Sequence, residues 1–186
     1  RLKRVAADKR GNIEHLMPKI APKNGKRVAC IGGGPASLTV ARDLAPLGYH
    51  VVVYDRDAAG GGMMRSQIPA FRLPEAVLNE EVERFFDFGI ETRFNQEVTS
   101  LKEVLNEDFD AVFVGTGAPR GRDLNIPGRE DVGDNFHIGI DWLMSVAFGH
   151  TSKIGKRVVV LGGGNTAMDC CRTAKRLGGE EVKVIV

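Results

Sequence analysis

The sequence predicts an α/β fold with two parallel sheets, because two glycine-rich turns each separate a short apolar run from a helical pattern. The first turn, Gly32-Gly33-Gly34, follows the apolar residues 28–31, and the second, Gly162-Gly163-Gly164, follows residues 158–161. Glycines at such a turn let a pyrophosphate approach the N–H groups at the start of the helix. Two turns that lie 130 residues apart therefore predict two dinucleotide-binding domains, the second of them incomplete.

The composition is that of a globular protein, with 186 residues, 42% of them hydrophobic and 27% charged. A net charge of +2 is too small to predict a nucleic acid or an anionic membrane as a partner. No apolar run approaches the roughly 20 residues that would span a bilayer. Cys30, Cys170 and Cys171 form no C-x-x-C pair, which argues against a zinc ribbon or a redox pair and favours a reducing, cytoplasmic location.

The first elements form a βαβ unit after an N-terminal extension. We expect a short basic helix in residues 1–9 and a surface linker in residues 10–25, which contain glycine and proline. Residues 26–32 are expected to form a buried strand, residues 34–47 a helix, and residues 51–54 the second strand. A unit of about 30 residues is the context in which a glycine turn binds a dinucleotide.

Asp55 is the candidate ligand of a ribose. It stands 23 residues after Gly32, at the tip of the second expected strand. A carboxylate at this position can accept hydrogen bonds from ribose hydroxyls. The alternative is an ordinary surface aspartate at the end of a strand, and the preceding βαβ pattern favours the ribose role.

A second group of glycines, residues 60–62, follows Asp55 and would allow a ligand close to the backbone, although a flexible loop is the alternative. Residues 68–74 hold two prolines and are expected to be extended. The remaining elements expected before the interdomain connection are a helix in 75–88, a strand in 90–94, a short helix in 100–106 and a buried strand in 111–114.

The second domain is expected to begin after a connection rich in Gly, Pro, Asp and Arg, residues 119–136. It starts with a helix in 139–147, a strand in 157–161 and a helix in 165–177. The predicted organisation is therefore an N-terminal helix and linker (1–25), a first domain (26–136) and the start of a second domain (137–186). Because the chain begins at Arg1 and stops within an apolar run at Val186, we expect it to be a fragment of a larger protein.

In combination these motifs resemble the small subunit of NADPH-dependent glutamate synthase. Similar flavin domains occur in dihydropyrimidine dehydrogenase and in related FAD/NAD(P)H electron-input subunits. The resemblance covers residues 26–186 and rests on these segments: Gly32-Gly33-Gly34-Pro35-Ala36-Ser37-Leu38, Asp55, Gly61-Gly62-Met63, Ile68-Pro69, Phe71-Arg72-Leu73-Pro74, Thr116-Gly117 and Gly162-Gly163-Gly164-Asn165-Thr166-Ala167-Met168-Asp169.

The resemblance implies a role for each matching position. The FAD pyrophosphate would be wrapped by Gly32, Gly34, Pro35, Ala36 and Ser37, and the adenosine ribose held by Asp55. The flavin half would meet Gly61, Gly62, Met63 and Arg72, while Arg65 is either a second phosphate or flavin contact or a solvated arginine. The remaining implied contacts are Val98 to adenine through its backbone, Thr116 and Gly117 over the FAD, and Gly162, Gly164, Asn165 and Thr166 to the pyrophosphate of the nicotinamide dinucleotide.

The sequence departs from the family pattern in two places. Ser37 replaces the third glycine of the first turn, and Ser66-Gln67 replaces a residue-then-glycine pair before Ile68-Pro69. The cysteine-rich iron–sulfur segment of the family does not occur in these residues. A [4Fe–4S] cluster is thus expected only in parts of the parent protein upstream of Arg1. The expected partners are the nicotinamide dinucleotide and an iron–sulfur domain or larger catalytic subunit.

The resemblance implies an oxidoreductase in which hydride passes from NAD(P)H to FAD and electrons leave for iron–sulfur centres or a partner subunit. Such chemistry belongs to the cofactors, so we nominate no catalytic acid or base. His15, His50, His137 and His150 have no metal-ligand spacing, and no metal site is expected. The alternative function is an FAD-binding scaffold without nicotinamide turnover.

The choice between NADPH and NADH stays open, although the resemblance favours NADPH. The residue that discriminates between them stands at the tip of the strand after the second turn. We expect this position to fall just past Val186, because extra residues occur near Gly179.

Overall fold

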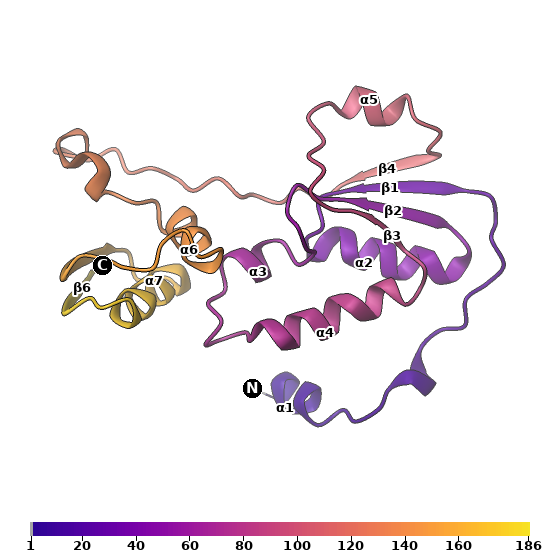
Figure 1. The fold of residues 1–186 in the computed structure, drawn as a ribbon, viewed down its shortest axis with the longest axis horizontal. Coiled ribbons are helices and arrows are strands. Elements are labelled where there is room, and N and C mark those ends of the chain that lie inside the picture. The colour runs from indigo at the N-terminus through magenta and orange to yellow at the C-terminus, as the bar shows by residue number, and fades with distance from the viewer. Residues whose placement is uncertain (1) are drawn as a thin grey trace.

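The computed structural model describes residues 2–186, in which parallel strands alternate with helices (Figure 1). The first sheet has four parallel strands in the order β3-β2-β1-β4, and the second pairs β5 with β6. This confirms the predicted α/β class. The strands are β1 (Arg27–Ile31), β2 (His50–Tyr54), β3 (Glu91–Arg93), β4 (Ala111–Val114), β5 (Arg157–Leu161) and β6 (Glu181–Ile185).

Helices cover both faces of the first sheet. Successive side chains along each strand point to opposite faces, and each face packs in its own apolar core. On one face, Cys30 and Val53 pack with residues of α2 (Pro35–Leu44) and α4 (Glu75–Phe86). On the other face, Tyr54 packs with α5 (Leu101–Leu105), which lies on the side of the sheet away from α2 in Figure 1. The central strands are therefore buried on both sides.

Two predictions for the first domain need refinement. The helix expected in residues 34–47 is α2 followed by a 3-10 turn, and Gly48 ends it in the left-handed conformation with φ of 90°. The strand at residues 111–114 forms as predicted, but it is not buried, since Val114 is 54% exposed. The reason is its place at the edge of the sheet, where β1 is its one neighbour among the described strands.

The segment expected to be extended, residues 68–74, is a turn instead. The N–H groups of Arg72 and Leu73 both donate to the carbonyl of Pro69, at 2.8 and 3.1 Å. Proline fixes φ near the value of a helical turn, and here this effect outweighs the extended preference of residues that precede proline. The short helix α3 (Met63–Ser66), which the sequence did not predict, stands just before this turn.

The N-terminal extension lies along the first domain. Helix α1 (Leu2–Asp8) is exposed, as expected for a short basic helix, and residues 14–16 form a single 3-10 turn within the linker. Arg10 ties this extension to α4 through hydrogen-bonded ion pairs with Glu80, at 2.7 Å, and with Glu81. These contacts hold the linker on the protein.

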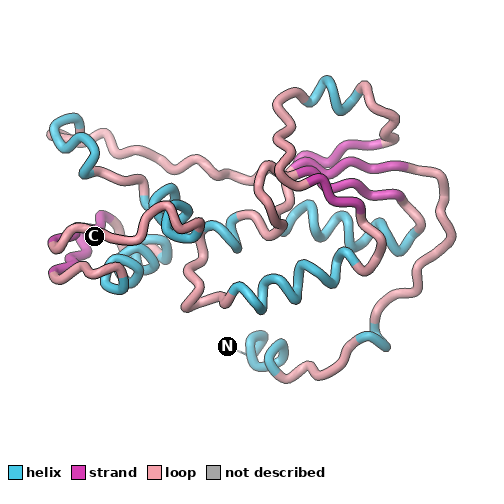
Figure 2. The backbone as a smooth tube through the Cα atoms, in the orientation of Figure 1, coloured by secondary structure: helices cyan, strands magenta, loops and turns pink. Residues whose placement is uncertain are grey.

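A long connection leads from β4 to the second sheet, and Figure 2 shows it as a loop that contains one short helical segment, Glu130–Asn135. Helices α6 (Gly139–Ala147) and α7 (Asn165–Arg176) then pack on one face of β5 and β6, around Trp142 and Cys170. The helix at 139–147 and the strand at 157–161 have the predicted bounds. Among residues 2–186, no helix has the length and apolar character needed to cross a membrane.

The first glycine turn gives a prediction about stability. Gly32 has φ of +94°, and a methyl group on it would lie 2.7 Å from the carbonyl oxygen of Gly115. Gly32→Ala should therefore lower the free energy of unfolding by about 1–3 kcal/mol through overpacking. The strain of an alanine in the left-handed conformation adds to this loss. Gly25→Ala is the matched control, because Gly25 has φ of +78° with nothing within 4 Å. Urea unfolding should show the larger loss for Gly32→Ala, and equal losses would contradict the close approach.

Candidate functional site

The two glycine turns have nearly the same backbone. Gly34 and Gly164 precede α2 and α7 with φ/ψ of −77°/177° and −78°/176°. Gly32 and Gly162 end the preceding strands with φ of +94° and +118°, a region that favours glycine. One strand–turn–helix geometry therefore occurs twice in the chain.

Both helices that follow these turns are suited to an anion. The first N–H groups of a helix lack intrahelical partners and carry partial positive charge. Neither α2 nor α7 has a side-chain cap or an acidic residue in its first turn. By contrast, α4 and α6 hold Glu75 and Asp141 there. The two glycine turns thus leave uncapped helix N-termini available to a phosphate.

The first turn is enclosed by two other backbone segments. The N–H of Gly61 donates to the carbonyl of Gly33 at 2.8 Å, and a methyl group on Gly62 would lie 2.8 Å from the Cα of Gly34. From the other side, Gly115 approaches Gly32 so closely that no side chain fits between them. A Cβ on Gly34 itself would meet nothing nearer than 4.0 Å, which leaves room for a ligand at the helix N-terminus.

Ser37 lies in the first turn of α2, fully buried, and its Oγ has no hydrogen-bond partner among the protein atoms described. The hydroxyl lies against Gly115, where it would be the nearest atom to an added methyl group. The uncapped helix and the open space before Gly34 together fit a pyrophosphate. The serine that departs from the family pattern is compatible with such a site.

Asp55 lies beside the first turn, as predicted. Its carboxylate accepts hydrogen bonds from the N–H groups of Gly33 and, at 2.9 Å, of Asp57. Its carbonyl accepts from Gln96 at 2.9 Å, which brings the segment that contains Val98 to the same edge of the sheet. The side chain of Val98 packs into the core, so its expected backbone contact with adenine stays a prediction.

Of the remaining residues expected at the FAD, Met63 begins α3 directly after Gly62 and is 40% exposed. Thr116 and Gly117 follow β4, where the N–H of Gly115 donates to Ile31 at 2.8 Å and holds this loop beside the first turn. The tertiary structure therefore brings together most of the positions expected around one dinucleotide.

The two candidate arginines are engaged elsewhere. Arg65 donates from Nε to the carbonyl of Gly60 at 2.9 Å and from Nη2 to Asn79 at 2.7 Å, so it holds the glycine loop against α4. Arg72 pairs through Nη1 with Asp169 of α7, at 2.5 Å, and this hydrogen bond raises the pKa of the arginine. The bonds of Arg65 use two of its five N–H donors, and its contact with a ligand stays a prediction. Sequence reasoning assigned no role to Asp169.

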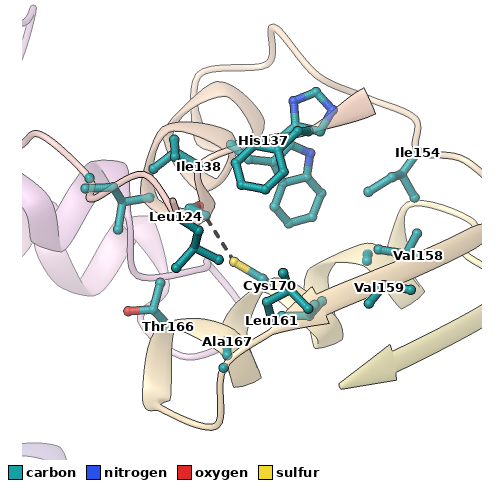
Figure 3. A pocket seen from close by; sticks show the side chains of 18 of the residues that line it. Leu124, His137, Ile138, Ile154, Val158, Val159, Leu161, Thr166, Ala167 and Cys170 are labelled. Carbon is teal, nitrogen blue, oxygen red and sulfur yellow. Dashed lines mark hydrogen bonds between the residues drawn. The ribbon is translucent and has the colours of Figure 1, made fainter. Parts of the chain in front are cut away.

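The second turn opens on a cavity of about 820 Å³. Gly162, Gly164, Asn165 and Thr166, the residues expected to bind the nicotinamide dinucleotide, all line it. Figure 3 shows Thr166 at one end of this pocket, with His137 and Ile138, which precede α6, and Val158 of β5 around it. The pocket has the size and the helix N-terminus that a dinucleotide site requires.

The counterpart of Asp55 in the second unit is Val186, and the prediction that it falls past this residue is wrong. The N–H of Gly32 donates to Tyr54, the residue before Asp55, at 2.8 Å. In the same way, the N–H of Gly162 donates to Ile185, the residue before Val186, at 2.7 Å. The longer loop near Gly179 moves the register by one residue only.

Side-chain positions support this correspondence. A methyl group on Gly33 would lie 2.8 Å from Asp55 Oδ2, and one on Gly163 would lie 3.0 Å from the Val186 side chain. The second unit therefore presents an isopropyl group where the first presents a carboxylate.

Among residues 2–186, the cysteines and histidines take part in no candidate metal site. Residues 2–186 contain no group of three metal-ligating side chains. Cys30 and Cys170 are buried, and burial raises the pKa of both thiols to about 11. Cys171 is partly exposed, because it lies on a different side of α7 from Cys170.

Two strand–glycine turn–helix units, each with an uncapped helix N-terminus, define a two-dinucleotide-binding α/β protein. Residues 26–186 match the family described as pyridine nucleotide-disulphide oxidoreductase, and the chain belongs to this family.

Curated relatives agree with the resemblance found in the motifs. The chain is 39% identical to the "NADPH-Fe(3+) oxidoreductase subunit beta" of Geobacter sulfurreducens, over 97% of this chain and 28% of that protein. It is 40% identical to the "Glutamate synthase [NADPH] small chain" of Escherichia coli, over 86% of this chain and 36% of that protein. The similarity to glutamate synthase small subunits is thus confirmed, and the chain spans about a third or less of these relatives.

A solved structure supports the fold. FprA of Mycobacterium tuberculosis, in its complex with NADPH, aligns with a TM-score of 0.68 at 22% identity. The alignment covers 88% of this chain and 43% of FprA. The match shows that this arrangement of strands and helices also occurs in FprA.

Thiol burial gives the second prediction. At pH 8 a thiol with a pKa of about 11 is ionised in about one molecule in a thousand. Iodoacetamide should therefore label Cys171 of the folded protein first and leave Cys30 and Cys170 unmodified, as read by mass spectrometry. Unfolding in guanidinium is the control and should expose all three. Equal labelling of Cys30 and Cys171 in the folded protein would contradict the burial of Cys30.

Proposed function

We propose that this chain is part of an FAD-dependent NAD(P)H oxidoreductase, in which the first glycine turn holds FAD and the second holds the nicotinamide nucleotide. The observation that carries the proposal is the repeated turn, with a carboxylate beside the first copy and an apolar residue beside the second. We assign residues 26–136 to the FAD domain and residues 137–186 to the start of the nucleotide domain, and we keep the cytoplasmic location expected from the cysteines.

At the FAD site, we infer that the N–H groups at the start of α2 donate to the pyrophosphate. Ser37 would belong to this pyrophosphate-binding turn, and Asp55 would accept from the adenosine ribose, since it already lies at the edge of the turn. Gly61 and Gly62 would allow the ligand close to the backbone, while Arg65 would keep that loop in place rather than contact a phosphate.

In this proposal the chain binds FAD and the nicotinamide nucleotide and orients them toward each other. FAD, when bound, accepts hydride from a reduced nicotinamide and can release electrons one at a time to iron–sulfur centres or a partner subunit. No nucleophile paired with a base is required. The identity of the final acceptor, an iron–sulfur domain or a larger catalytic subunit, belongs to the same proposal.

Val186 favours NADPH over NADH. A carboxylate at this position would accept hydrogen bonds from the ribose hydroxyls of NADH and would repel the 2′-phosphate of NADPH. Val186 does neither, so the phosphorylated nucleotide meets no negative charge there. Relatives named for NADPH and for NADH both occur, and this residue therefore carries the inference more directly than their names do.

The decisive experiment is an anaerobic flavin-bleaching titration of the whole protein with NADPH and NADH in parallel. Rapid bleaching by NADPH, and slower bleaching by NADH, is the expected result. Bound flavin that neither nucleotide reduces would overturn the oxidoreductase assignment and indicate an FAD-binding scaffold instead.

A pair of matched substitutions separates the two sites. Gly34→Val places an isopropyl group in the open space before α2 and should abolish FAD binding. Gly164→Val does the same before α7, where nothing lies within 4 Å, and should weaken NADPH binding while FAD remains. Flavin absorbance and nucleotide titration measure the two effects. Full flavin content in Gly34→Val would contradict the assignment of the first turn.

Val186→Asp tests the nucleotide preference. The new carboxylate should lower the ratio of NADPH to NADH efficiency at least about tenfold, or about 1.4 kcal/mol, because it repels the 2′-phosphate and binds ribose hydroxyls. Val186→Asn, with the same shape and no charge, is the control and should have a much smaller effect. An unchanged ratio in Val186→Asp would show that another residue decides the preference.

A further inference from the structure

A short segment of the first domain docks on the helix that follows the second glycine turn. We call residues 68–74, the turn between α3 and α4, the strap. Arg72 of the strap pairs with Asp169 of α7, with 2.5 Å between Nη1 and Oδ2. Asp169 is 8% exposed at its side chain, whereas Arg72 is 42% exposed. The carboxylate is the desolvated partner, and it would be a buried, unpaired charge without the arginine.

The same face of α7 holds a second contact with the strap. The guanidinium carbons of Arg172 and Arg176 lie 4.5 and 3.8 Å from the centre of the Phe71 ring. Asp169, Arg172 and Arg176 recur at helical spacing, so they form one stripe along the helix. The strap therefore contacts α7 through an ion pair and two cation–π contacts.

Around these contacts the junction is mostly apolar. Helix α3 lies beside α6, as Figure 1 shows, and a cavity of about 470 Å³ between them is lined by Met64, Leu73, Leu143 and Phe148, among others. Apolar packing is not directional. Within residues 2–186, Arg72–Asp169 is the one ion pair that joins residues 26–136 to residues 137–186. It therefore fixes the relative orientation of these two parts, which the apolar contacts alone do not fix.

A continuous path joins the two glycine turns through the strap. Gly62 lies against Gly34 of the first turn, and α3 and the strap follow it directly in sequence. The strap then holds Asp169, which stands one helical turn after Asn165, the first residue of α7. A shift of the strap would move the second turn relative to the first.

We propose that Arg72 and Asp169 are positioning residues, which fix the nicotinamide turn relative to the FAD turn for hydride transfer. This inference rests on the proposed function. Hydride transfer requires near-contact geometry, and a displacement of about 1 Å can slow such a step about a hundredfold. The pair acts through the position of α7, and its loss should lower the rate of transfer more than it lowers nucleotide affinity.

The test uses the whole protein with bound FAD and the variants Arg72→Gln, Asp169→Leu and the double variant. Stopped-flow flavin reduction at increasing NADPH gives the limiting rate and the dissociation constant separately. We expect each single variant to lower the limiting rate at least about tenfold, with flavin content and reduction by dithionite unchanged. The double variant should be no slower than the slower single variant, because the two residues act as one unit.

Two further variants keep the inference falsifiable. Lys156→Gln removes an exposed ion pair with Glu180 in the same domain and should retain the wild-type rate. Arg72→Lys keeps the charge and should restore part of the rate. If Arg72→Gln loses FAD, the limiting rate of flavin reduction in Arg72→Lys tests the inference instead. A partial loss of this rate with full flavin content supports the positioning role. A wild-type rate overturns it.

The outcomes separate this inference from the proposed function. A wild-type flavin that neither NADPH nor NADH reduces overturns the proposed function and, with it, the positioning role. A wild-type flavin that is reduced, with Arg72→Gln and Asp169→Leu equally fast, overturns the positioning role alone. Rate losses that multiply in the double variant would also overturn it, because they would show two independent effects.

Discussion

The close approach of three backbone segments at the first glycine turn is the constraint on which the proposed FAD site depends. A methyl group at Gly32 would meet the carbonyl of Gly115, and one at Gly62 would meet the backbone of Gly34. The absence of side chains lets the loops after β2 and β4 meet at the end of β1. This packing leaves the N-terminus of α2 uncapped and places Asp55 beside it, and the proposed binding of a pyrophosphate and a ribose rests on these two features.

The second turn repeats this backbone at the site proposed for the nicotinamide nucleotide. Gly164 repeats the φ/ψ of Gly34 within about one degree. The helix dipole and the N–H groups recognise a phosphate in either copy and carry little information about the rest of the ligand. The residue at the next strand tip differs between the two units: it is Asp55 in one and Val186 in the other. In the proposed function, the backbone geometry therefore binds phosphate in both units, and this side chain distinguishes the nucleotides.

The two units also contact each other away from the two glycine turns, through the ion pair of Arg72 with Asp169. Exposed ion pairs such as Lys156–Glu180 contribute little, because water screens both charges. Asp169 differs, since its side chain is almost fully desolvated and depends on Arg72 for its counter-charge. An arginine that the motif pattern associates with the flavin is, in the tertiary structure, the link between the two halves.

The sequence by itself determined the α/β class, both glycine turns, and the helix and strand at 139–147 and 157–161, because each depends on apolar periodicity and on turn residues within a short window. Only the tertiary structure decided the partner of Arg72, since Asp169 lies 97 residues away and no local pattern joins them. It also decided the register that makes Val186 the counterpart of Asp55, because strand pairing sets register across a loop of variable length. Short-range sequence patterns specify elements, whereas long-range packing decides which side chains meet.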